Sequence, residues 1–294
     1  MLKKILVPLD GSELGELVLP YVEEMGRRLD SEIVLLHFCL PDLEQFCHEH
    51  QIYLQHISQI VKRHTKSTVK TVALAGRANR IIVDYALNED VGLIVGLSRS
   101  ESDTSKWTIG STADKVIRET SKPVLIINAE GSTIKRGSNI LNKVLIPLDG
   151  SRASEAILPY VRNFMYGISK DEETEVTLLR VLSPSHHVPV GEAVVIVPYT
   201  DVELSQLKEQ AESYLVEIGK ELEQDGIIVH CDAVTRSNST ADQILDVAKK
   251  SKINLIAMST HGRTGISRLF LGTTTDRVLH SINIPILLIK PTED

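Results

Sequence analysis

The stretch KILVPLDGS at residues 4–12 returns almost unchanged as KVLIPLDGS at residues 143–151. The two copies differ at two positions, where Ile and Val change places. Each copy is a short apolar run of the kind that forms a buried parallel strand, followed by Asp-Gly, which is typical of a turn. A repeat of this quality indicates that one structural unit occurs twice along the chain.

The repeat continues through both halves in further matched stretches: LPYV at 19–22 and 158–161, VGLIVG at 91–96 and INLIAM at 253–258, and GSTADKVIR at 110–118 and GTTTDRVLH at 272–280. The offset between the copies grows from 139 to 162 residues, so the second copy carries about 23 extra residues, mostly between 170 and 205. The polar segment 129–140 has no periodicity and is predicted to be a linker. We therefore predict two domains, residues 1–138 and 139–294.

Within each copy, short apolar runs alternate with amphipathic helical patterns. In the first copy the expected strands are residues 4–9, 32–38, 69–74, 91–97 and 123–127. Helical stripes of apolar residues run through 43–64 and, in the second copy, 204–222. This order predicts an α/β fold in which each copy is a doubly wound, five-stranded parallel sheet with helices on both faces.

The last strand of each copy, at 123–128 and 285–290, is apolar and is expected at a sheet edge. An exposed apolar edge invites pairing with another strand. We predict that the two copies pair through these edges and form an internal pseudo-twofold dimer.

Charge and hydropathy exclude several classes of partner. The formal net charge is −7, and neither half carries the basic excess that nucleic-acid phosphates or anionic lipids would attract. No apolar run approaches the ~18 residues needed to cross a bilayer. We therefore expect a cytoplasmic protein that binds neither nucleic acid nor membrane.

In doubly wound sheets ligands bind beyond the carboxyl ends of the strands, where the strand order reverses. This rule points to the loops after the first and fourth strands of each copy. The first loop contains Asp10 in one copy and Asp149, after Pro147 and Leu148, in the other. Such an aspartate could accept hydrogen bonds from a ribose hydroxyl or an adenine amine, or it could cap the following helix.

The second loop differs between the copies. In the second copy it reads Ser259-Thr260-His261-Gly262, then nine residues, then Gly272-Thr273-Thr274 at the start of a helix. Glycine lets a backbone approach a ligand closely, and a helix start with hydroxyl side chains offers donors to an anion. The pattern suits a phosphate chain, although a glycine-rich loop that only turns the chain has the same composition.

These residues resemble the universal stress protein family in its tandem two-domain form. The resemblance covers essentially the whole chain and rests on PLDGS and on the family's nucleotide pattern, Gly-x2-Gly-x9-Gly-Ser/Thr. The second copy matches this pattern with Ser259 at the first glycine position. The resemblance implies that ATP or AMP is bound, with Asp149 holding the ribose or adenine and Val181 presenting backbone groups to the adenine.

It further implies that Gly262, Gly272, Thr273 and Thr274 bind ribose and phosphates. The predicted cofactor-binding set is Pro147, Leu148, Asp149, Val181, Ser259, His261, Gly262, Arg263, Gly272, Thr273 and Thr274. Mg²⁺ could accompany a triphosphate, but we predict no protein metal ligand and no catalytic residue.

The first copy departs from the pattern. Leu97 and Ser100 stand at the two earlier glycine positions, and Phe38 replaces Val181. The residues that follow include Glu101 and Asp103, which would repel phosphates. We interpret the first nucleotide site as degenerate.

The predicted function is nucleotide binding in stress response or signalling. The alternatives are a slow ATPase, an enzyme that phosphorylates itself on a loop hydroxyl such as Thr273, and an interaction module without nucleotide. A homodimer is also expected as one form of assembly. The extra segment 184–203 mixes Pro, Gly and apolar residues, and it is predicted to be a mobile cover without regular structure near the nucleotide site, with a simple surface excursion as the alternative.

Overall fold

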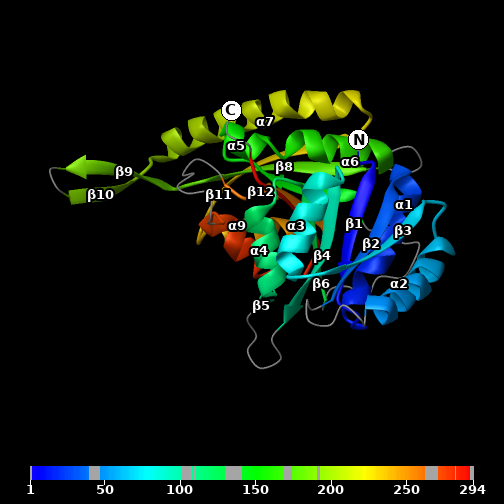
Figure 1. Cartoon of the computed structure of the whole chain (residues 1–294). Helices are drawn as coiled ribbons and strands as arrows, with labels where there is room; N and C mark the ends of the chain where they lie inside the picture. The colour runs from blue at the N-terminus through cyan, green and yellow to red at the C-terminus, as the bar shows by residue number, and fades with distance from the viewer. Residues whose placement is uncertain are drawn as a thin grey trace.

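A computed structural model describes residues 2–39, 47–100, 107–108, 110–129, 141–168, 174–190, 193–261, 271–281 and 283–291. Across these residues one 11-stranded sheet runs through the molecule in the order β11-β8-β7-β12-β13-β6-β4-β1-β2-β3, with β5 paired to β4 (Figure 1). The predicted boundary at 138/139 lies outside the described residues, between β6 and β7.

The strands of the first half are β1 (Lys4–Leu9), β2 (Glu32–Cys39), β3 (Val69–Ala75), β4 (Leu93–Ser100), β5 (Trp107–Thr108) and β6 (Val124–Asn128). Those of the second half are β7 (Lys143–Pro147), β8 (Glu175–Leu182), β11 (Ile228–Thr235), β12 (Leu255–Ser259) and β13 (Ile286–Ile289). In each half the main strands are parallel, and the strand order reverses beside the first strand. The predicted doubly wound α/β fold is confirmed.

Helices cover both faces of the sheet (Figure 1). One face carries η1 (Gly15–Val18), α1 (Leu19–Leu29), α2 (Cys47–Lys62), α5 (Arg152–Glu155), α6 (Leu158–Ile168) and α7 (Asp201–Gln224). The other face carries α3 (Ala78–Asn88), α4 (Ser111–Glu119), α8 (Thr240–Lys250) and α9 (Thr273–Leu279). Because both faces are covered, the central strands are apolar at successive positions.

The first strand illustrates this burial. Ile5 and Val7 point to the face of α1 and α2, whereas Leu6, between them, points to the face of α3 and α4. All three side chains are fully buried. Alternation along a strand explains why a continuous apolar run, rather than a period-two pattern, marks the sheet in the sequence.

The two halves are joined edge to edge by antiparallel pairing of β6 with β13. Leu125 pairs with Leu287, and these two residues occupy equivalent positions in the two copies. On either side, Ile126 pairs with Ile286 and Val124 pairs with Leu288. In the repeat, Val124 corresponds to Ile286 and Ile126 corresponds to Leu288, so one pair becomes the other when the two copies are exchanged. An internal twofold axis through Leu125 and Leu287 requires this relation. The predicted pseudo-twofold pairing is confirmed.

The extra residues of the second copy form a two-stranded antiparallel ribbon, β9 (Ser185–Val190) and β10 (Ala193–Pro198), that projects from the body (Figure 1). The expectation that residues 184–203 lack regular structure is therefore wrong. A sequence signal for the ribbon was present, because Gly191-Glu192 separates two runs rich in Val and Ile. A two-residue spacer with Gly first is typical of a hairpin turn.

Within the described ranges, no helix combines the length and apolar character that crossing a bilayer requires.

The junction predicts the behaviour of a chain cut between the domains. A protease site placed within residues 130–140 and then cleaved should leave the two halves associated, because β6–β13 pairing and both apolar layers cross the junction. Gel filtration with light scattering should give the mass of the intact chain after cleavage. Elution as two separate halves would contradict the pairing.

Candidate functional site

The second half contains a cavity of about 180 Å³ at the carboxyl ends of β7 and β12, where the strand order reverses. Nine of the predicted residues line it: Pro147, Leu148, Asp149, Val181, Ser259, His261, Gly272, Thr273 and Thr274. The remaining two, Gly262 and Arg263, lie outside the described residues. The strand topology thus gathers residues that are more than 100 positions apart around one space.

Asp149 orders the loop after β7. Its Oδ1 accepts hydrogen bonds from the Ser151 backbone N–H at 3.0 Å and from the Ser151 hydroxyl at 2.5 Å. Gly150 between them has φ +75°, a conformation that favours glycine. The N-cap of α5 is Ser151, whose hydroxyl accepts from the Ser154 N–H at 3.1 Å, so Asp149 does not itself cap the helix.

The corresponding loop of the first half is built in the same way. Asp10 Oδ1 accepts from the Ser12 N–H at 3.0 Å and from the Ser12 hydroxyl at 2.6 Å. Gly11 has φ +81°. The repeated DGS sequence therefore specifies one turn geometry in both copies.

Sequence reasoning missed the group that supports this loop from behind. In the second half, Arg180 donates through Nη1 to the Leu148 carbonyl at 3.3 Å and lies 6.0 Å from the Tyr214 ring centroid. Tyr214 donates its hydroxyl to Glu155 at 2.7 Å, and burial raises the pKa of Tyr214 well above its usual range. The loop is thus fixed to β8, α7 and α5.

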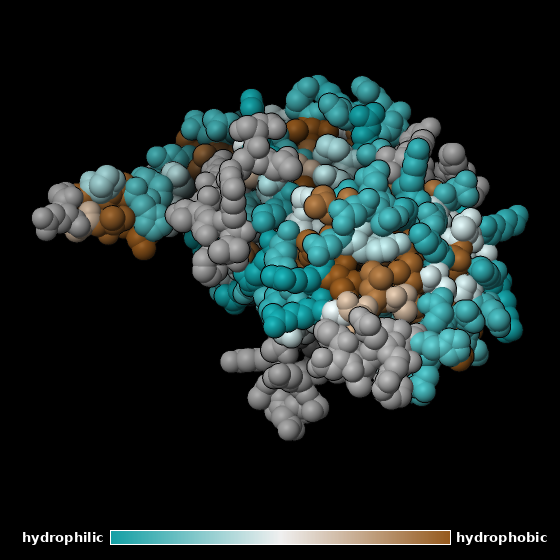
Figure 2. Space-filling view, in the orientation of Figure 1, coloured by the Kyte–Doolittle hydropathy of each residue, from teal (hydrophilic) through white to brown (hydrophobic). Residues whose placement is uncertain are grey.

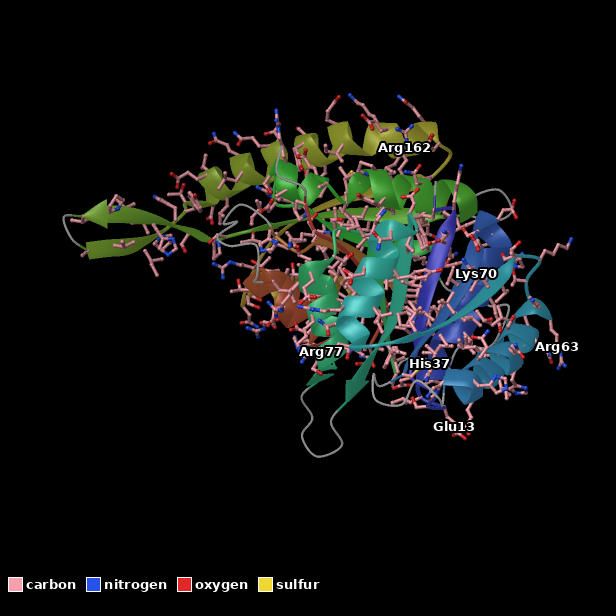
Figure 3. All side chains as sticks on the ribbon, viewed as in Figure 1. Glu13, His37, Arg63, Lys70, Arg77 and Arg162 are labelled. Carbon is pink, nitrogen blue, oxygen red and sulfur yellow. The ribbon has the colours of Figure 1, made fainter. Side chains whose placement is uncertain are left out.

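In the first half a histidine replaces this arginine. His37, on β2 (Figure 3), donates through Nδ1 to the Leu9 carbonyl at 2.6 Å, and its ring centroid lies 5.8 Å from that of Tyr53. Tyr53 donates to Glu16 at 3.1 Å, as Tyr214 does to Glu155. The same three-residue support therefore exists in both halves, with a different basic group.

Close backbone packing joins the end of β12 to the start of α9. The Gly272 N–H donates to the Thr260 carbonyl at 2.8 Å, and a Cβ added at Gly272 would lie 3.1 Å from that oxygen. The Thr275 hydroxyl donates to the Ser259 carbonyl at 3.1 Å. A Cβ at position 272 would therefore be a tight contact, and glycine allows the close approach that sets Thr273 and Thr274 on the cavity wall.

His261 carries the most informative polar atom of the cavity. Its Nδ1 forms a hydrogen bond with the Thr260 hydroxyl at 2.9 Å. Its Nε2 is buried and has no hydrogen-bond partner among the described residues. Buried polar atoms are nearly always paired in folded proteins, so this nitrogen fits a ligand that enters the cavity.

Six further lining residues were not anticipated from the sequence: Ser154, Leu179, Thr240, Ile244, Met258 and Thr275. Most of them lie on strands or helices, and the sequence motifs singled out loops. Leu179, Val181, Ile244 and Met258 give the cavity an apolar part, and the hydroxyl side chains give it a polar part. The arrangement suits a flat ring with a polar extension.

Comparison with known proteins identifies the family of this chain. The model of the universal stress protein family matches residues 1–128 and 141–290. The chain belongs to this family. Its two matched segments, together with the duplicated sheet, make it a tandem universal stress protein.

Individual relatives of this universal stress protein match one domain or both. Universal stress protein MJ0531 of Methanocaldococcus jannaschii is 31% identical over 161 residues, covering 54% of this chain and 88% of its own length. Universal stress protein Slr1230 of Synechocystis is 27% identical, covering 67% of this chain and 57% of its own. The crystal structure of a universal stress protein from Archaeoglobus fulgidus covers 98% of both chains with a TM-score of 0.71 at 20% identity, a likeness of fold.

The residues offer little to a metal ion. Within the described ranges, no group of three or more His, Cys, Asp or Glu side chains could hold one. Asp149 is the one carboxylate among the described residues that line the cavity. The lining therefore does not fit a protein-held Mg²⁺, and any such ion would depend on nucleotide oxygens.

His37 predicts a pH dependence of stability. Burial lowers the pKa of His37 below 6.5, so the folded protein favours the neutral ring. The stability that this provides is present above pH 6.5 and is lost as the pH falls below it. His37→Gln should therefore lose less free energy of unfolding than the parent between pH 7 and pH 5 in urea titrations. His56→Gln, at an exposed position of α2, should show the same change of unfolding free energy with pH as the parent. The same change in all three proteins would contradict the prediction.

Proposed function

We propose that the second domain binds an adenine nucleotide, ATP or AMP, and that this binding serves a stress-response or signalling role in the cytoplasm. The observation that carries the proposal is a cavity at the switch point of the sheet whose lining includes His261, a residue whose buried Nε2 has no hydrogen-bond partner among the described residues. Membership of the universal stress protein family supports the stress-related role.

The shape of the cavity supports a nucleotide rather than a free phosphate. A volume of about 180 Å³ is close to that of an engineered ~150 Å³ cavity that accepts benzene, so it suits a base ring. Val181 and Met258 offer apolar contact to such a ring. Asp149 is suited to accept a hydrogen bond from a ribose hydroxyl, and His261 and Thr273, which also line the cavity, are suited to donate to phosphate oxygens.

The net charge of −7 supports a small-molecule ligand over nucleic acid or anionic membrane, since neither polyanion would be attracted.

The chemistry of the lining supports binding more than turnover. Phosphoryl transfer needs a group that activates the nucleophile together with stabilisation of developing charge. Asp149, a titratable residue on the cavity wall, already accepts hydrogen bonds from Ser151. Its carboxylate is thus used to hold the loop rather than to activate a nucleophile.

Calorimetric titration of the full chain with ATP, AMP and cAMP tests the proposal. We expect one adenine nucleotide per chain. His261→Ala should weaken binding about tenfold or more, because a hydrogen bond to a charged group contributes ~1.5–3 kcal/mol. Mass spectrometry of the nucleotide after incubation should recover ATP, and conversion to ADP would indicate hydrolysis instead.

Each half provides the matched control for the other. Ser259→Leu places in the second site the residue that the first copy carries at position 97, and it should abolish nucleotide binding. Leu97→Ser, the reverse change in the first half, should leave the affinity and the stoichiometry unchanged. Two sites in the parent, or binding that survives Ser259→Leu, would refute the assignment to the second domain.

We also propose that a homodimer forms through the β9–β10 ribbon. The ribbon projects as an apolar arm (Figure 2). Val194 and Ile196 are 63% and 62% exposed on one face, and Val195 is 45% exposed on the other. An isolated two-stranded ribbon with apolar residues on both faces is marginal in water, and burial against another strand would stabilise it.

The register of the ribbon indicates which edge is open. The Tyr199 N–H donates to the Pro184 carbonyl at 3.0 Å, and Ile196 lies opposite His187. Because antiparallel pairs alternate, Val194 and Ile196 direct their backbone N–H and C=O groups away from β9. The outer edge of β9 includes Pro189, which has no N–H. The β10 edge can therefore pair with the same edge of a second copy about a twofold axis.

Ile196→Pro tests this dimer, because it removes an outward N–H without removing a hydrogen bond inside the ribbon. It should raise the dimer dissociation constant about tenfold or more, as measured by sedimentation equilibrium. Val216→Lys, at an exposed apolar position on α7, should leave the dissociation constant unchanged. A parent protein that is monomeric at all concentrations would rule out the ribbon dimer.

A further inference from the structure

The first half contains a larger cavity than the second, at the equivalent switch point between β1 and β4. Its volume is about 330 Å³, against about 180 Å³ in the second half. The sequence predicted a degenerate nucleotide site here, but bulky replacements have not closed the space. We propose that this cavity is a binding site for a small uncharged molecule with an apolar body and a hydroxyl group.

Small residues on the cavity wall explain its size. Gly96 stands where the second half has Met258, and Gly15 stands where it has Ser154. A Cβ added at Gly96 would lie 3.6 Å from the Ile126 Cδ1, an ordinary contact. Glycine at position 96 is therefore not required by the backbone around it, and its effect is to leave open the volume that Met258 fills in the other copy.

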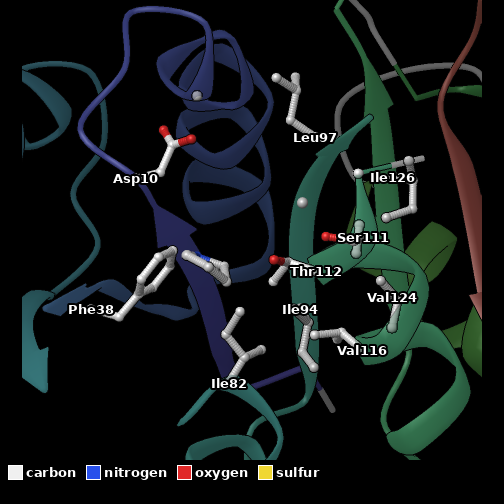
Figure 4. Close-up of a pocket in the computed structure, with 15 residues that line it drawn as sticks. Asp10, Phe38, Ile82, Ile94, Leu97, Ser111, Thr112, Val116, Val124 and Ile126 are labelled. Atoms are coloured by element: carbon white, nitrogen blue, oxygen red, sulfur yellow. The ribbon is translucent and has the colours of Figure 1, made fainter. Parts of the chain in front are cut away.

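The lining of the first cavity is also more apolar. Among the described lining residues, eight of fifteen in the second half have polar side chains, and in the first half only Asp10, Ser111 and Thr112 do. Phe38 and Ile82 lie on one side of the cavity, opposite Ile94 (Figure 4). The remaining apolar lining consists of Pro8, Leu97, Ala113, Val116, Val124 and Ile126. Burial of an apolar ligand body is the favourable interaction that such a wall offers.

The three polar side chains define the other end of the ligand. The hydroxyls of Ser111 and Thr112, at the start of α4, face into the space across from Phe38, and Asp10 lies at the edge (Figure 4). Hydroxyls can both donate to and accept from a ligand hydroxyl. The Asp10 carboxylate, held by Ser12, can accept a hydrogen bond from a ligand hydroxyl, and among the described residues no basic side chain lines this cavity. A neutral hydroxyl fits this end better than a phosphate or a carboxylate.

The volume limits the size of the apolar body. A cavity of about 330 Å³ is roughly twice the ~150 Å³ that accepts one benzene ring. It falls at the lower end of the range of small-molecule pockets, which begins at ~300 Å³. A two-ring aromatic molecule or a short branched chain matches this space.

2-Naphthol, a two-ring compound with one hydroxyl that is uncharged at neutral pH, is a suitable probe. Calorimetric titration of the full chain should give saturable binding of one molecule per chain. Gly96→Met, which supplies the second copy's residue, should weaken binding about tenfold or more, whereas Gly96→Ala should have a smaller effect. The carboxylate analogue 2-naphthoate should bind the parent at least about tenfold more weakly than 2-naphthol.

Circular dichroism and thermal unfolding establish that each variant is folded. Val216→Lys, at an exposed apolar position on α7, serves as the control for adsorption to apolar surface, and it should bind 2-naphthol like the parent. Equal affinity of the parent and a folded Gly96→Met, or loss of binding in Val216→Lys, would overturn the proposal. The outcome is independent of nucleotide binding, because no arm of the experiment contains nucleotide.

Discussion

The antiparallel pairing of β6 with β13 is the constraint on which the architecture depends. Each half ends in an apolar strand whose exposed edge would be unfavourable in water, and pairing about Leu125 and Leu287 satisfies both edges together. The result is one sheet with two apolar layers that continue from one half into the other. Within this arrangement each half retains its own switch point and its own crevice.

Duplication has preserved the frame of the crevice while its lining has changed. Both halves keep the Asp-Gly-Ser turn and the tyrosine–glutamate pair that supports it. The wall differs most at one strand position, where Gly96 in the first half corresponds to Met258 in the second. One copy thus has a small cavity rich in hydroxyls, and the other has a larger apolar cavity. A ligand in one crevice need not resemble a ligand in the other.

Much of this could be predicted from the sequence, because buried parallel strands are continuous apolar runs and the repeat supplies each element twice. The ribbon was missed because Pro and Gly were interpreted as signs of irregular structure, although Gly191-Glu192 between runs rich in Val and Ile indicates a hairpin. In the site, loop motifs identified residues such as Asp149 and His261. The motifs could not reveal the support from Arg180 or the open volume beside Gly96, because these depend on packing between distant strands.

The central claim is that two equivalent crevices hold ligands of unlike chemistry. Methyl NMR spectra of the full chain, labelled at Met and Ile methyl groups, test it most directly. ATP should shift the signals of Met258 and Ile244 in the second cavity, and 2-naphthol should shift those of Ile82 and Ile126 in the first. With both ligands present, both sets should be shifted together. Movement of the same set of signals by both ligands would contradict the account.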